Sequence, residues 1–159
     1  MRIRYSLIAT LVTALAVAPA LADTGFIANL SGLNEVGPNA SPASGTGFLV
    51  LNNAGTLLTY SVTYSGLLAA RTAAHFHGPA LPGVNAGVVF GIAGSGPAAG
   101  NISGTWAIDP TNVARLNSGQ LYVNIHTSVF PGGEIRGQVV PDATPSRPSS
   151  WGRIKTLYR

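Results

Sequence analysis

Hydrophobic and polar residues alternate in short runs along the middle of the chain, and Gly, Pro and Asn separate the runs. No stretch shows the sustained period of an amphipathic helix, whereas alternation over four to eight residues is typical of β-strands. Short strands divided by turn residues predict an all-β fold, here a Greek-key-like antiparallel β-sandwich or barrel. The expected strands are Gly25–Leu30, Thr46–Leu51, Leu57–Tyr64, Ala73–His77, Gly87–Ile92, Ile102–Ile108, Gln120–Thr127 and Glu134–Val140.

One short helix is expected, over Pro110–Leu116. Asp109 precedes it as an N-cap, and Pro110 suits the first helical position because the amide that proline lacks would have no helical partner there. The residues Asn117–Gly119 end it. The helix is one or two turns long, so the sheet must supply most of the core.

The N-terminal residues predict a signal peptide over residues 1–22. Arg2 and Arg4 precede an apolar run from Leu7 to Val17, and Ala20-Leu21-Ala22 gives the small-x-small pattern of a signal peptidase site. The run is too short to span a bilayer comfortably, and no later stretch is long and apolar enough. We therefore expect a secreted or periplasmic protein with no membrane span after signal removal.

The basic character of the chain comes from its ends. The formal net charge is +4, but three arginines stand against five acidic residues between Asp23 and Asp142. Nucleic-acid binding needs clustered Lys and Arg, so a nucleic-acid partner is not expected. The expected domain covers residues 23–140, and residues 141–159 form a basic, Pro- and Ser-rich tail that we expect to be disordered. The chain has no cysteine, which excludes disulfides and thiolate chemistry.

Three of the expected strands carry one apolar and one strongly polar face, because alternate residues of a strand point in opposite directions. All three histidines lie on the polar faces. The polar positions are His75 and His77 on the first of these strands, Gln120, Tyr122, Asn124 and His126 on the second, and Glu134, Arg136 and Gln138 on the third.

The last two strands are joined by residues 128–133 and form an expected hairpin, in which facing residues share a side of the sheet. The favoured register sets Tyr122 opposite Gln138, Asn124 opposite Arg136 and His126 opposite Glu134. A shift by two residues, which sets His126 opposite Arg136, also preserves the pattern. A shift by one would place polar side chains against apolar ones.

Four segments resemble motifs of the CHRD (chordin) domain family, in the stand-alone bacterial type. They are Leu30–Val36 (LSGLNEV), Ala74–Ala80 (AHFHGPA), Gly119–Thr127 (GQLYVNIHT) and Gly132–Gln138 (GGEIRGQ). Gly37-Pro38 stands where the family pattern has paired prolines. The resemblance covers Phe26 to Val140 and implies an extracytoplasmic β-sandwich of the immunoglobulin or superoxide-dismutase type. It implies no established activity.

The histidines are the candidate metal ligands. An H-x-H pair on a strand projects two imidazoles to the same side about 7 Å apart at the backbone, and imidazole is a common ligand for copper and zinc. His126 on a neighbouring strand would complete a three-nitrogen site for one copper or zinc ion. Glu134 beside His126 would be a fourth ligand or an acceptor that orients the ring, and Arg136, Asn124 and Tyr122 would form the surrounding network.

Three other interpretations stay open. The histidines can be a purely structural hydrogen-bond network. The protein can be a structural or adhesive domain that binds an extracytoplasmic protein or polysaccharide without metal. The weakest alternative is a copper-dependent redox enzyme, because the chain lacks the second set of histidines that a paired copper and zinc site needs. We favour a non-catalytic binding module in which His75, His77 and His126 are a candidate copper or zinc site.

Overall fold

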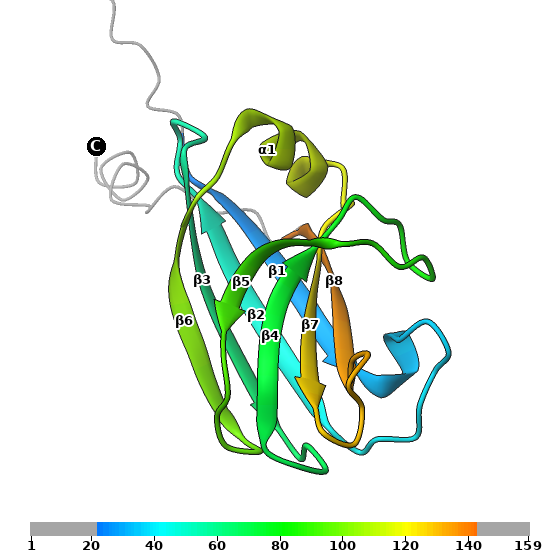
Figure 1. The fold of residues 1–159 in the computed structure, drawn as a ribbon. Coiled ribbons are helices and arrows are strands. Elements are labelled where there is room, and N and C mark those ends of the chain that lie inside the picture. The colour runs from blue at the N-terminus through cyan, green and yellow to red at the C-terminus, as the bar shows by residue number, and fades with distance from the viewer. Residues whose placement is uncertain (1–21, 143–159) are drawn as a thin grey trace, which may run out of the picture.

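The computed structural model describes residues 22–142 and is organised around a single antiparallel sheet (Figure 1). Residues 1–21 and 143–159, which hold nearly all of the expected signal peptide and tail, lie outside the described residues. In chain order, the elements are β1 (Thr24–Ser31), the 3-10 helix η1 (Gly32–Asn34), β2 (Ser44–Leu51), β3 (Leu57–Ser65), β4 (Arg71–His77), β5 (Val88–Ala93), β6 (Gly100–Ala107), α1 (Pro110–Asn117), β7 (Tyr122–Thr127) and β8 (Ile135–Pro141).

The strands follow the order β5-β4-β7-β8-β1-β2-β3-β6, and every neighbouring pair is antiparallel. The two edge strands, β5 and β6, approach each other, so the sheet curls into a nearly closed barrel. This result confirms the expected all-β antiparallel fold. It also gives the more specific form, since one sheet surrounds the core instead of two separate sheets packing face to face.

Alternation of side chains places the core inside this barrel. On β7, Val123 and Ile125 are fully buried and point inward, while on β4 Phe76 does the same. Trp106 of β6 stacks against Phe76, with ring centres 5.6 Å apart, and so joins the two ends of the sheet. The interior is one contiguous hydrophobic cluster.

The helix lies at one end of the barrel (Figure 1). Its first turn is capped as expected, because Asp109 Oδ1 accepts a hydrogen bond from the Asn112 amide at 3.0 Å. Leu116 is buried and anchors α1 to the barrel end. The helix therefore acts as a cover for the core.

The hairpin register agrees with the favoured expectation inside the strands. Tyr122 pairs with Gln138 and Asn124 pairs with Arg136. The strand begins only at Ile135, however, and Glu134 lies in a bend before it. The alternation that fixes side-chain direction within a pleated strand therefore does not extend to Glu134.

Candidate metal centre

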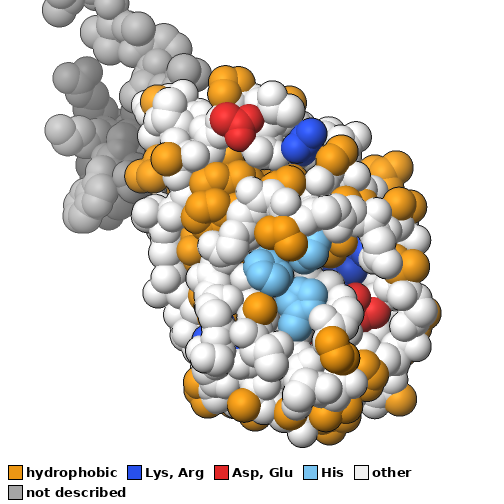
Figure 2. All heavy atoms as spheres, in the orientation of Figure 1, with side chains coloured by type: hydrophobic (Ala, Val, Ile, Leu, Met, Phe, Trp, Pro, Cys, Tyr) orange, Lys and Arg blue, Asp and Glu red, His pale blue; other side chains and the backbone are white. Residues whose placement is uncertain are grey.

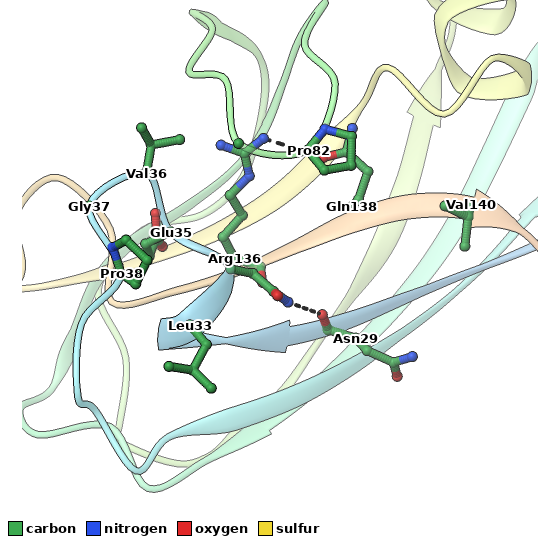
Figure 3. Close-up of a pocket in the computed structure, with 12 residues that line it drawn as sticks. Asn29, Leu33, Glu35, Val36, Gly37, Pro38, Pro82, Arg136, Gln138 and Val140 are labelled. Atoms are coloured by element: carbon green, nitrogen blue, oxygen red, sulfur yellow. Dashed lines mark hydrogen bonds between the residues drawn. The ribbon is translucent and has the colours of Figure 1, made fainter.

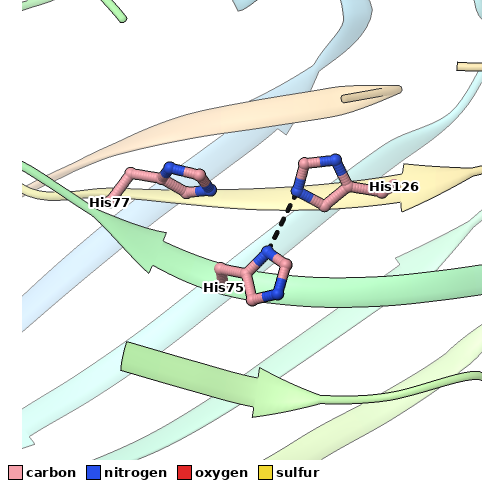
Figure 4. A group of neighbouring side chains, drawn as sticks. All are labelled: His75, His77 and His126. Carbon is pink, nitrogen blue, oxygen red and sulfur yellow. Dashed lines mark hydrogen bonds between the residues drawn. The ribbon is translucent and has the colours of Figure 1, made fainter. Parts of the chain in front are cut away.

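The three histidines of the chain come together on the outer side of strands β4 and β7. His75 and His77 lie on β4, and His126 lies on β7, where it pairs with Ala73 and is diagonal to His75. The ring centres of His75 and His126 are 5.0 Å apart, and those of His75 and His77 are 5.6 Å apart. Figure 4 shows the three rings converging, and one ligand nitrogen from each lies within 4.8 Å of the others.

Two backbone carbonyls fix the proton positions of two of these rings. His77 Nδ1 lies 2.9 Å from the Ala86 carbonyl oxygen, and His126 Nδ1 lies 3.0 Å from that of Pro131. A carbonyl only accepts, so each Nδ1 carries the proton and each neutral ring keeps a lone pair on Nε2. Loop carbonyls that receive the remote N–H are the usual way in which metal-binding histidines are oriented.

His75 connects to the other ring directly. Its Nδ1 lies 3.2 Å from His126 Nε2 and is the donor of that hydrogen bond, because His126 Nε2 carries a lone pair. His77 Nε2 is buried and has no partner among the described residues. A buried nitrogen lone pair without a donor is costly, and a bound cation is one group that would satisfy it.

The surroundings favour the neutral forms of the His77 and His126 rings. Burial lowers the pKa of His77, and the nearby His126, His75 and Arg136 lower it further, although the hydrogen bond to Ala86 acts in the opposite direction. Burial also lowers the pKa of His126, with a smaller contribution from His75, while the bond to Pro131 opposes it. Neutral imidazoles bind metals without first losing a proton, so the site is available to a cation at neutral pH.

Tyr122 separates the histidines from a buried arginine. Its ring stacks on His77 with centres 4.9 Å apart and planes inclined by 7°, and the Arg136 guanidinium carbon lies 3.5 Å from its centre. Strands β4 and β8 flank β7, so His77 and Arg136 contact Tyr122 from opposite sides. Arg136 is only 1% exposed, and its hydrogen-bond acceptors Asn85 Oδ1, Leu81 O and Gln138 Oε1 are all neutral.

Glu35 is a member of this polar layer that the sequence analysis did not place in the site. Asn124 Nδ2 donates to Glu35 Oε2 at 3.5 Å, and Glu35 Oε1 has no partner among the described residues. Burial raises the pKa of the Glu35 carboxyl to about 7, although Arg136 and Asn124 pull it down. Its presence in the Leu30–Val36 motif was the only sequence signal.

Position 133 must be glycine here, since its φ is +138° and a Cβ would collide with Asn124 and Glu35.

Glu134 does not take the position expected for it beside His126. Its carboxylate accepts hydrogen bonds from Ser41 Oγ at 2.6 Å, the Leu68 amide at 2.8 Å and Thr127 Oγ1 at 2.6 Å. Thr127 faces the side of β7 opposite to His126, and Glu134 is fully buried. The bend before β8 turns the side chain away from the histidines, which corrects the expectation of a fourth ligand or ring acceptor at this residue.

A cavity of about 540 Å³ adjoins the same layer (Figure 3). Glu35 and Arg136 contribute polar groups to its wall, and Leu33, Pro38 and Pro82 contribute apolar ones. Arg136 thus borders this cavity and also contacts Tyr122, so one side chain links the cavity wall to the aromatic stack beside His77.

The histidines form one patch on the molecular surface, and most of the atoms around this patch are uncharged (Figure 2). Three imidazole nitrogens that converge from two strands are a donor set suited to copper or zinc. The carbonyls of Ala86 and Pro131 belong to loops, and no side-chain pattern in the sequence reports them.

One of three comparisons with known proteins gives a match, and it agrees with the motifs. The family model described as CHRD domain matches residues 26–139, which is most of the chain. No curated protein and no solved structure matches the chain. Among the described residues, no helix has the length and apolar character needed to cross a membrane. Because the family model covers well over half of its residues, the chain belongs to the CHRD domain family.

Proposed function

We propose that this protein is an exported, non-catalytic binding module in which His75, His77 and His126 hold one copper or zinc ion. Export is inferred from the signal-peptide pattern of residues 1–22. The observation that carries the metal proposal is the pair of Nδ1–H···O=C hydrogen bonds from His77 and His126, which leave two Nε2 lone pairs beside His75.

The spacing supports this proposal. Zinc and copper bind imidazole nitrogen at about 2.0–2.1 Å, which sets nitrogen–nitrogen separations of about 3.3–3.6 Å around one ion. His75 Nδ1 and His126 Nε2 are 3.2 Å apart, which is close to this range, and a ligand nitrogen of His77 lies within 4.8 Å of the other two, so small side-chain rotations suffice. The ion would replace the hydrogen bond between these two rings, and the His75 proton would move from Nδ1 to Nε2, which leaves the Nδ1 lone pair for the ion.

The test is calorimetric titration of the mature, tag-free chain with Cu(II) and with Zn(II). We expect one ion per chain, and we expect the double variant H75A/H77A and the single variant H126A to lose at least 100-fold in affinity. Asn101→Ala is the matched control, because Asn101 is a polar strand residue on β6 whose partners are Ser61 and Thr63. Its affinity should equal that of the native chain.

Two results would refute the proposal. One is a native chain that binds neither ion, in which case the histidines are a structural network and the domain acts through a protein or polysaccharide partner. The other is full affinity in H75A/H77A when circular dichroism shows it folded, since the ion would then bind elsewhere.

A further inference from the structure

We infer that the histidine site selects monovalent copper, Cu(I), over Cu(II) and Zn(II), and that the charge of Arg136 contributes to this selection. The inference rests on the proposed function and names the ion that the three rings hold. It follows from the charges that surround the site.

The ligands bring no negative charge. All three are imidazoles, which bind an ion in their neutral form, and the Glu134 carboxylate is directed to Ser41, Leu68 and Thr127 instead of to the rings. A divalent ion would therefore keep two uncompensated positive charges in a partly buried setting. The cost of burying an ion rises steeply with its charge, so a monovalent ion is penalised much less.

Arg136 adds a fixed positive charge one aromatic ring away. Its guanidinium lies 3.5 Å from the Tyr122 ring centre, and the opposite face of that ring stacks on His77. Because Arg136 is almost fully buried, water screens this charge poorly. A unit charge about 8 Å away, at an effective dielectric constant of about 20–40, weakens binding about tenfold for each unit of charge on the ion.

Glu35 is the acidic group that partly offsets Arg136. The two side chains attract each other, but burial raises the pKa of Glu35 to about 7, so this carboxyl carries only part of a negative charge at neutral pH. The direct hydrogen-bond acceptors of Arg136 are neutral. Within this pair, part of the positive charge of Arg136 therefore remains uncompensated near pH 7.

The experiment compares three ions on the mature, tag-free chain. Cu(I) affinity is measured without oxygen, with ascorbate as reductant and bicinchoninate as competing chelator. Cu(II) affinity is measured against glycine, and Zn(II) affinity is measured by calorimetry. The variants are R136M, which removes the charge, R136K, which keeps it, and E35Q, which removes the acidic group.

We expect the native chain to bind Cu(I) most tightly. R136M should lower the ratio of Cu(I) to Cu(II) affinity about tenfold, mainly through tighter Cu(II) binding, and R136K should restore the native ratio. E35Q should raise the ratio at pH 8, where Glu35 is mostly ionised, and change it little at pH 6. If Arg136 and Glu35 had only a structural role, their replacement would weaken the binding of all three ions to the same degree.

Tighter binding of Zn(II) or Cu(II) than of Cu(I) by the native chain would overturn the inference while leaving the metal site intact. If R136M does not fold, E35Q still decides the electrostatic part, since an unchanged ratio at pH 8 contradicts it. Failure of the native chain to bind any of the three ions would instead refute the proposed function itself.

Discussion

At the scale of single residues, the most informative feature is a carboxyl group held in a polar but poorly hydrated layer. Glu35 ionises near pH 4.5 in an unfolded chain and at about pH 7 in the folded one. The folded state therefore holds this proton more tightly. The stabilisation of the folded state by the protonated Glu35 carboxyl is fully present below pH 4.5 and is lost as the pH rises through about 7.

Replacement of Glu35 by Gln should remove this pH dependence. The free energy of unfolding of E35Q, relative to the native chain, should rise by up to about 3 kcal/mol between pH 4.5 and pH 8. Urea unfolding of both proteins across this range measures the difference.

Asp109→Asn is the control of opposite sign. Hydrogen bonds from Asn112 lower the pKa of Asp109, so the loss caused by this variant should grow as the pH rises from 3 to 5. If the free energies of unfolding of E35Q and of the native chain changed with pH in the same way, the raised pKa of Glu35 would be contradicted.

Residue identity and alternation were sufficient to predict that the three histidines lie on one side of neighbouring strands. They could not reveal that Glu35, which precedes the second strand by several residues, folds back onto Asn124. Such a contact between distant segments depends on the path of a loop, and no periodic pattern encodes it. The carbonyl partners of His77 and His126 escaped prediction for the same reason.

At the scale of elements, Glu134 acts as a clamp between segments. Its carboxylate joins Ser41 before β2, Leu68 before β4 and Thr127 at the end of β7. It thereby fixes the turn that carries Pro131 and, through Pro131, the ring of His126.

Truncation of this clamp should be severe for stability. Glu134→Ala leaves one buried and two partly buried donors without an acceptor and should lower the free energy of unfolding by about 3–5 kcal/mol. Thr127→Val removes one donor to Glu134 and the acceptor of the Phe130 amide, and it should cost about 1–2 kcal/mol. Chemical denaturation measures both. Losses below 1 kcal/mol in each variant would show that the hydrogen bonds do not support the turn.

Strand and helix boundaries were predicted within a few residues, because alternation and the Asp109-Pro110 cap are local signals. The start of β8 is the instructive exception. The apolar–polar pattern continued through Glu134, but the backbone bends there, and the side chain is buried among hydroxyl and amide donors instead of beside His126.

At the scale of the whole molecule, an aromatic cluster closes the barrel. Trp106 of β6 stacks on Phe90 of β5 at 4.8 Å and on Phe76 of β4 at 5.6 Å, and Tyr60 of β3 meets Phe76 edge-on at 5.5 Å. These rings bridge strands that lie at opposite ends of the sheet order. The sequence predicted a sandwich or barrel but could not choose between them, because the choice depends on how these distant strands meet.

Trp106→Ala should lower the free energy of unfolding by about 3–5 kcal/mol, because Trp106 is only 5% exposed and its removal leaves a cavity at the closure. Phe48→Ala is the matched aromatic control on the outer face, where Phe48 is 59% exposed, and should cost less than about 0.5 kcal/mol. Urea unfolding measures both, and equal losses would show that the closing cluster contributes no more than a surface ring.

Because every histidine of the chain lies in the cluster, spectroscopic signals from histidine report on this site alone. With three histidines in total, all in the cluster, any histidine-selective signal arises there without background. Nitrogen-edited NMR of the rings should resolve each tautomer, and acylation by diethylpyrocarbonate should be slowed by any ion that occupies the rings. The same feature makes a polyhistidine purification handle unsuitable, since its imidazoles would outnumber those of the protein and compete for every added metal.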